Sequence, residues 1–315
     1  MGKRYRSNSI YSRKNKMRII AYTAADKNNM EYVRKMTNSF HHFHPDIEMK
    51  IYTELDIKDP INWYKQKPLF AKELIKDYDL VIGFDADQII TGDLSYMFDK
   101  DYDVAVVNNF CRSDIPIYGA ISVFDIPVDQ YMNCGMVAMK SAKFINNWWN
   151  LCNSFHFQNM RYREQDLLNL MIHFGDWKVL PLDRSVVGYN AWHGLLSKGE
   201  WLKMKLVDGK LILPKAKDNY PESDKEIKVM HWAGGNQPNK LNYRITCTEE
   251  VIEYLDELVK ERTNEKPFTL KDIKTLNKKE LSYLEGRFLS EPLPRSKKEL
   301  QGLIKEAIEN AKKET

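Results

Sequence analysis

Apolar residues recur along the chain with two different periods, which together predict an α/β fold. Short apolar runs rich in β-forming residues predict strands, and apolar positions spaced by three and four residues predict helices. The predicted strands cover residues 18–23, 48–52, 79–84, 103–107, 134–139, 178–180 and 228–231, and the predicted helices cover residues 28–44, 63–77, 141–155 and 163–174. Because strands alternate with helices of this length, the pattern favours a mostly parallel sheet with helices on both sides.

The two ends of the chain lack this alternation. Residues 1–16 are polar and basic without periodicity, and we interpret them as a disordered segment. From residue 263 onward the chain is rich in Lys and Glu, and two amphipathic stretches predict a C-terminal helical extension. The stretches are separated at Glu291-Pro292-Leu293-Pro294, where a helix cannot continue. We therefore expect one folded domain over residues 17–262, with a loop or flap at 108–132.

Composition narrows the class of protein. The chain has 315 residues, of which 43% are hydrophobic and 29% charged, as in a globular protein with a sizeable core. The net charge of +4 comes from the basic ends, whereas the body is mildly acidic. Since nucleic-acid binders usually carry positive charge on the folded face that grips phosphates, this distribution argues against dedicated nucleic-acid binding. The sequence leaves open whether the C-terminal helices contact an acceptor, a partner or an anionic membrane surface, or instead pack on the folded domain.

Localisation is predicted from what the sequence lacks. No apolar run approaches the roughly 18 residues that span a bilayer, and the basic N-terminus is not followed by the apolar stretch of a secretory signal. The four cysteines, Cys111, Cys134, Cys152 and Cys247, form no C-x-x-C pair. We interpret them as reduced thiols of a cytoplasmic protein.

The most informative stretch is a buried strand that ends in two carboxylates. Leu80-Val81-Ile82-Gly83-Phe84 is apolar almost throughout and leads directly into Asp85-Ala86-Asp87. Ligands of open α/β sheets bind outside the carboxyl ends of strands, so Asp85 and Asp87 are expected at the edge of a site. Mg²⁺ and Mn²⁺ prefer oxygen ligands, often carboxylates together with substrate phosphates. The pattern therefore predicts a metal that neutralises a diphosphate.

Four segments in this order carry a resemblance to a known family. They are Lys67-Pro68 before the strand that ends at Asp85-Ala86-Asp87, then Asn133-Cys134-Gly135, Glu164-Gln165-Asp166-Leu167-Leu168-Asn169, and His231-Trp232-Ala233-Gly234. With them the chain resembles the GT-A-fold glycosyltransferases, and more narrowly glycosyltransferase family 8 and the glycogenin-like retaining enzymes. The resemblance covers roughly residues 18–240 and implies a GT-A fold, a mixed α/β sheet of Rossmann-like halves, for the catalytic domain.

The resemblance also implies roles for individual residues. Asp85, Asp87 and His231 would hold the metal, which would be Mn²⁺ or Mg²⁺. Gln165 would face the anomeric carbon and Asp166 would bind sugar hydroxyls. The remaining positions expected around the donor are Tyr22 and Thr23 near the nucleotide base, Lys67 near the phosphates, Asn133 and Gly135 beside the sugar, and Ala86 and Gly234 within the two metal-binding segments.

Each of these residues also has a structural alternative. His231 follows two apolar residues and could be a core histidine, and Lys67 could be a lysine on a helix surface. Gln165 and Asp166 could form the polar face of a helix, and Gly135 could be a plain strand glycine.

Two departures from the family pattern stand out. Gln237-Pro238-Asn239 replaces the expected Lys-Pro-Trp, so Lys240 is the candidate for the missing diphosphate-binding lysine. Glu164 stands where Asp is commoner.

The predicted function is transfer of a sugar from a nucleotide sugar, UDP-linked in the group that the chain resembles, with retention of anomeric configuration. The acceptor hydroxyl would attack from the front face, with the departing phosphate as base. An inverting enzyme with Asp166 or Asp183 as general base is one alternative, and a non-catalytic nucleotide-sugar binder on the same fold is another. The sequence leaves the acceptor open among a glycan, a lipid-linked sugar, a protein side chain and a modified nucleic-acid base, and it leaves the oligomeric state open.

Overall fold

The computed structural model describes residues 17–57, 60–108, 125–127, 130–154, 156–183, 187–190, 195–197, 200–212, 225–231 and 247–260. The predicted basic N-terminal segment, most of the flap predicted at 108–132 and the C-terminal extension from residue 263 lie outside these residues. The domain boundaries of the sequence analysis therefore stay predictions.

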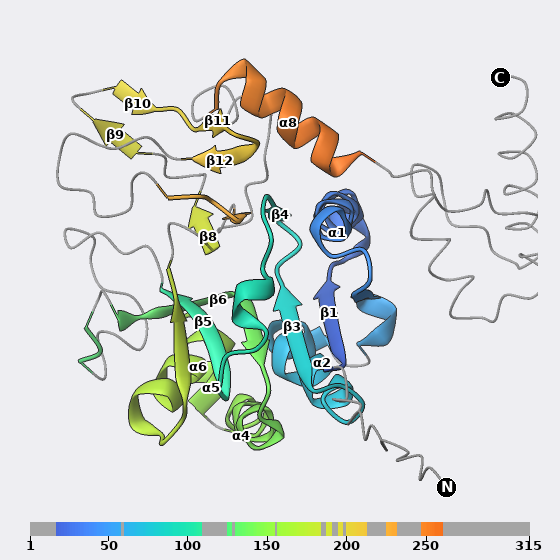
Figure 1. Cartoon of the computed structure of the whole chain (residues 1–315). Helices are drawn as coiled ribbons and strands as arrows, with labels where there is room; N and C mark the ends of the chain where they lie inside the picture. The colour runs from blue at the N-terminus through green and yellow to red at the C-terminus, as the bar shows by residue number, and fades with distance from the viewer. Residues whose placement is uncertain are drawn as a thin grey trace, which may run out of the picture.

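A six-stranded sheet forms the centre of the molecule (Figure 1). In spatial order its strands are β2 (Glu48–Tyr52), β1 (Ile19–Ala24), β3 (Leu80–Phe84), β6 (Met132–Met139), β5 (Val104–Asn108) and β7 (Val179–Leu182). The pairs β1–β2, β1–β3 and β5–β7 are parallel, whereas β6 runs antiparallel to both β3 and β5. The sheet is thus mostly parallel, with one reversed strand beside the strand that leads to Asp85.

Helices cover both faces of this sheet. One face packs on α2 (Gln66–Leu74), α4 (Ala142–Cys152) and α6 (Arg163–Phe174), and the other packs on α1 (Met30–Phe43) and the short turn η4 (Ser95–Met97). The remaining short helical segments are η1 (Lys27–Asn29), η2 (Glu54–Asp56), η3 (Pro60–Lys65) and α5 (His156–Asn159). All five residues of β3 are buried, as expected for a strand covered on both faces.

A second, smaller sheet stands against the carboxyl end of β3. It consists of β4 (Gln88–Ile90), β13 (Val229–His231) and β8 (Val187–Asn190), in that order, with β13 antiparallel to β4 and parallel to β8. Two hairpins accompany it, β9 (Leu195–Ser197) with β10 (Glu200–Leu202), and β11 (Lys205–Val207) with β12 (Lys210–Ile212).

Helix α8 (Glu249–Val259) closes a separate apolar cluster over this second sheet. Val251, Leu255 and Leu258 of α8 are buried with Ile89 of β4 and Met230 of β13. The helix also contacts α1, where the Asn38 amide donates a hydrogen bond to the Val259 carbonyl at 2.9 Å. The second sheet is thereby held against the main domain on the side opposite β8.

The secondary structure agrees closely with the sequence-based elements. Strand β2 and helix α6 have the predicted bounds, and Ser141 caps α4 by accepting a hydrogen bond from the Phe144 N–H, as predicted. The helix predicted at 63–77 begins as the 3-10 segment η3 and is α-helical only from Gln66 to Leu74. Among the described residues, no helix is long and apolar enough to cross a bilayer.

Candidate metal centre and surrounding site

The site begins where two central strands end. The Thr23 hydroxyl at the end of β1 donates to the Phe84 carbonyl at 3.1 Å, which ties the ends of β1 and β3 together. The next N–H, that of Asp85, donates to the Gly135 carbonyl of β6 at 2.7 Å. These bonds fix the backbone of the Asp85-Ala86-Asp87 turn before the chain continues into β4.

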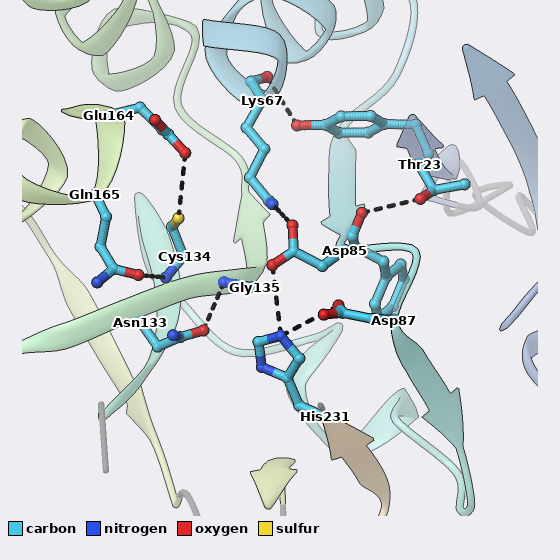
Figure 2. A network of polar contacts seen from close by, with 12 residues as sticks. Thr23, Lys67, Asp85, Asp87, Asn133, Cys134, Gly135, Glu164, Gln165 and His231 are labelled. Carbon is cyan, nitrogen blue, oxygen red and sulfur yellow. Dashed lines mark hydrogen bonds and ion pairs between the residues drawn. The ribbon is translucent and has the colours of Figure 1, made fainter. Parts of the chain in front are cut away.

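Three predicted ligands converge at this turn. Since β4 pairs with β13 so that Gln88 lies opposite His231, the imidazole is brought beside both carboxylates. Its Nε2 lies 3.5 Å from Asp85 Oδ2 and 3.4 Å from Asp87 Oδ1, and one ligand atom from each residue falls within 4.8 Å of the others. Figure 2 shows the two carboxylates pointing toward the ring. Sequence positions far apart thus form one cluster of the kind that holds a divalent cation.

The donor atoms of this cluster fit a cation. Asp87 Oδ1 and His231 Nε2 are both buried and have no hydrogen-bond partner among the described residues. Buried polar atoms of this kind are rare because each unsatisfied group costs roughly 1–3 kcal/mol. A divalent ion between the two carboxylates and the imidazole would satisfy these atoms, and Asp85, Asp87 and His231 are the residues that would hold it.

Gly135 explains how His231 comes so close to β6. A Cβ atom added at this position would overlap the His231 imidazole, with Nδ1 at 2.8 Å, and would meet Asn133 Oδ1 at 2.7 Å. The same Asn133 oxygen accepts the Gly135 N–H at 2.6 Å. Absence of a side chain at Gly135 is therefore a condition for the contact between the two sheets.

Two cationic side chains, Lys67 and His231, lie against the carboxylates. The buried Lys67 ammonium donates to Asp85 Oδ1. Burial disfavours the charged form of both side chains, but the attraction between them outweighs burial and lowers the pKa of the Asp85 carboxyl. Burial also opposes charge on His231, but Asp87 and then Asp85 raise the pKa of its imidazole to about 9. At neutral pH a proton therefore occupies the imidazole nitrogen that a metal would bind.

A second group of polar residues borders the Lys67 side of the site. The Cys134 N–H donates to Gln165 Oε1 at 3.0 Å, and the Cys134 thiol lies 3.9 Å from Glu164 Oε1 (Figure 2). Burial raises the pKa of Glu164 to about 7, although Lys67 acts in the opposite direction. A carboxyl group that is partly protonated near neutral pH thus lies beside Lys67.

No role was predicted for Glu164 from the sequence, where it stood out only as a departure from the commoner Asp. The useful signal was its place at the start of α6, next to Gln165, with a side chain one methylene longer than that of Asp.

Asp166 lies in a buried environment between β6 and α6. It is 0% exposed, and its two carboxylate oxygens accept hydrogen bonds from the Tyr131 hydroxyl at 2.6 Å and the Tyr162 N–H at 2.8 Å. Asn169 in turn bonds both the N–H and the carbonyl of Met132. In this structure these two residues hold the start of α6 against β6, and binding of sugar hydroxyls by Asp166 would require its present bonds to break.

The other predicted donor-binding residues fall into three groups. Tyr22 is buried in the core, where its hydroxyl donates to the Lys67 carbonyl at 2.8 Å and its backbone lies between β2 and β3. Ala86 and Thr23 lie at the carboxyl ends of the central strands, beside the metal ligands. Gly234 and Lys240 lie outside the described residues.

Comparisons with known proteins agree with this architecture. No protein-family model and no curated protein matches the sequence. The chain is similar to the galactosyltransferase LgtC, solved in complex with donor and acceptor sugar analogues, with 15% identity over 77% of this chain and 97% of that chain and a TM-score of 0.51.

A more distant likeness is to the bifunctional glycosyltransferase WbbM, at 15% identity over 82% of this chain and 51% of that chain with a TM-score of 0.47. Another is to the glycosyltransferase GlyE of Streptococcus pneumoniae, at 13% identity over 79% of this chain and 67% of that chain with a TM-score of 0.43. The likeness to LgtC shows a shared fold and confirms the predicted GT-A class. Membership of family 8 stays a prediction.

Proposed function

We propose that this chain is a metal-dependent glycosyltransferase that moves a sugar from a UDP-linked donor to an acceptor hydroxyl with retention of configuration. The observation that carries the proposal is the meeting of Asp85, Asp87 and His231 at the carboxyl end of β3, with two buried ligand atoms that have no hydrogen-bond partner among the described residues. The shared fold with LgtC, which was crystallised with donor and acceptor sugar analogues, supports the same class.

The residues around the cluster suit departure of a diphosphate. A bound divalent cation would neutralise the charge that develops on the leaving group. Mn²⁺ accepts an imidazole beside carboxylates more readily than Mg²⁺, which prefers oxygen ligands throughout. Lys67 places a second positive charge at Asp85 Oδ1, on the side of the carboxylate away from His231. The cation and Lys67 would together stabilise UDP as it departs.

Residues on β6 and α6 would orient the donor sugar. Asn133 and Gly135 lie beside the candidate metal ligands, where the Asn133 side-chain oxygen accepts the Gly135 N–H. Gln165 is held in one orientation because its Oε1 accepts the Cys134 N–H and its Nε2 donates to the Tyr131 hydroxyl at 3.3 Å. A rigid amide at this position can stabilise charge near the anomeric carbon without reorganising.

Retention is favoured by the state of the two alternative bases. An inverting enzyme needs a free carboxylate on the acceptor side. Asp166 is buried with both oxygens bonded, and Asp183 forms an ion pair with Lys225. Front-face attack, with the departing phosphate accepting the proton of the acceptor, needs neither residue.

Hydrolysis of UDP-sugars tests the proposal. The protein is incubated with Mn²⁺ and UDP-glucose, UDP-galactose or UDP-N-acetylglucosamine, and released UDP is measured with and without EDTA. We expect slow release from at least one donor, its loss in EDTA, and an α-configured product by NMR when an acceptor is supplied. Full activity in EDTA would contradict the metal role, and a β-configured product would favour inversion. Binding of UDP without any turnover would favour the non-catalytic alternative.

A further inference from the structure

Two exposed tyrosines and two arginines lie together where η3 meets the start of α6. Tyr64 is 58% exposed and Tyr162 is 37% exposed. Arg161 is exposed, and Arg163 is partly exposed. We call these four residues, Tyr64, Arg161, Tyr162 and Arg163, the rim patch.

The arginines are arranged over aromatic rings. The Arg163 guanidinium carbon lies 6.0 Å from the centre of the Tyr64 ring, and that of Arg161 lies 5.6 Å from the centre of the Tyr162 ring. Arg163 also donates to the Gln158 carbonyl at 3.1 Å. These contacts hold planar donors and aromatic faces side by side at the surface.

The backbone of Arg163 is strained at this point. Its φ is +46°, in the left-handed region that residues other than Gly rarely adopt. Such strain is concentrated at functional sites, where the surrounding contacts maintain it. Here the strained residue immediately precedes Glu164.

The rim patch is continuous with the candidate site. The Tyr162 N–H is bonded to Asp166, and Glu164 and Gln165 follow Arg163 directly along α6. On the other side of the patch, Tyr64 precedes Lys67 by three residues. Both elements thus run from the patch to the residues proposed to bind the donor sugar. An acceptor must reach the donor sugar, and the rim patch lies where the acceptor would approach it.

The charge of the patch is positive. Lys65 lies close by, with its ammonium 4.9 Å from the Phe157 ring on which Arg163 also rests. The nearest described acids on α6 face inward, since Glu164 contacts Cys134 and Asp166 is buried. Aromatic faces cover the apolar face of a sugar ring, and guanidinium groups bind carboxylates and phosphates in a fixed geometry.

We propose that the rim patch is the acceptor subsite and that it takes an acidic carbohydrate, a sugar bearing a carboxylate or a phosphate. This inference rests on the proposed function, because it takes the Glu164 and Gln165 side of the site to hold the donor sugar. Two tyrosines and two arginines cover about the area of one or two sugar rings. That footprint favours a short acidic glycan over the long phosphate track of a nucleic acid.

Direct binding of monosaccharide probes tests the inference separately from turnover. The full chain, with Mn²⁺ and UDP present to fill the donor side, is titrated by NMR with methyl β-D-glucuronide, glucose 6-phosphate and neutral methyl β-D-glucoside. We expect at least one acidic probe to bind about tenfold more tightly than the neutral one, the difference expected of one good charge-assisted hydrogen bond. The stronger of the two acidic probes identifies carboxylate or phosphate as the anion.

Single variants separate charge recognition from ring contact. Arg161→Gln should remove most of the preference for the acidic probe, whereas Tyr64→Ala should weaken acidic and neutral probes alike. Arg18 is an exposed arginine paired with Asp79 at the amino ends of β1 and β3, away from the site. Arg18→Gln should therefore change neither the preference for the acidic probe nor the binding of the neutral probe. Arg163→Gln is a second test of charge, with a melting curve to show that α6 still forms.

Equal binding of acidic and neutral probes, no binding of any probe, or an unchanged preference in Arg161→Gln would overturn the inference. So would an oligonucleotide of eight uridines that binds more tightly than either acidic sugar and is displaced by neither. A lack of UDP-sugar hydrolysis in the wild-type protein contradicts the proposed function instead, so the two failures are distinguishable.

Discussion

Asp87 is the metal-ligand candidate whose loss should affect function with least effect on the fold. Its Oδ1 is buried near His231 without a hydrogen bond. Asp87→Ala should lower UDP-sugar turnover by about 10²-fold or more, the effect typical of removing one preorganised electrostatic group from a transition state. The matched control is Asp101→Ala, an exposed aspartate paired with Lys178, which should keep wild-type turnover. Equal turnover of the two variants, measured as released UDP, would contradict the metal role.

His231 should make metal binding depend on pH. Because the pKa of its imidazole is raised to about 9, a proton must leave before the nitrogen can bind a cation. Affinity for Mn²⁺ should therefore fall by about tenfold per pH unit as pH is lowered from 8 to 6.5. Calorimetry at pH 7.5 in two buffers of different ionisation enthalpy should show release of close to one proton per ion. Release of no proton would mean that His231 is not a ligand.

At the scale of single residues, the candidate metal ligands were easier to find in the sequence than their surroundings. Asp85 and Asp87 stood out because they directly follow an apolar strand, His231 was expected only through the resemblance to GT-A enzymes, and the structure brings the three side chains together. The environment of Asp166 was not predictable, because its two partners, the Tyr131 hydroxyl and the Tyr162 N–H, come from β6 and from the turn before α6. That packing decides which of the two carboxylates, Glu164 or Asp166, is buried and which faces the site.

The contact between β6 and β13 is the element-level feature on which the site depends. Gly135→Ala would place a methyl group against the His231 imidazole and Asn133. We expect overpacking of roughly 1–3 kcal/mol, expressed mainly as weaker Mn²⁺ binding, about tenfold or more. Gly209→Ala is the control, because its φ of +73° makes alanine strained there while no described atom lies within 4 Å of the added methyl, so it should lower stability without weakening Mn²⁺ binding. Metal affinity that is unchanged in Gly135→Ala would show that the two sheets can separate without loss of the site.

Elements were predicted well where their pattern is local. Strand β3 is a continuous apolar run and helix α6 is periodic, and both appear as expected. Strand β4 was missed because three residues carry no period, and its partner β13 lies far along the chain. Helix α8 was missed although signals were present: Thr248 caps it by accepting the Val251 N–H, and its buried positions recur at four and three residues.

For the whole molecule, the cluster under α8 should contribute measurably to stability. Leu255 is 1% exposed within it, so Leu255→Ala should lower the free energy of unfolding by about 2–5 kcal/mol. Leu55 is 70% exposed, and Leu55→Ala should change stability by less than about 0.5 kcal/mol. Urea unfolding followed by circular dichroism measures both. If Leu255→Ala costs no more than Leu55→Ala, α8 does not hold the second sheet in place.

The pairing of β4 with β13 has a consequence for the order of events during folding. The carboxylates of Asp85 and Asp87 are synthesised long before His231, and the cluster that positions β13 is completed only by α8. Contacts between such distant segments form late, because a long loop must close first. A nascent or partly folded chain would therefore carry the aspartates without His231, the third candidate ligand, and on the proposed function it would not yet hold a cation or hydrolyse a nucleotide sugar. In refolding experiments, Mn²⁺ binding should appear with the slowest phase, after most secondary structure has formed.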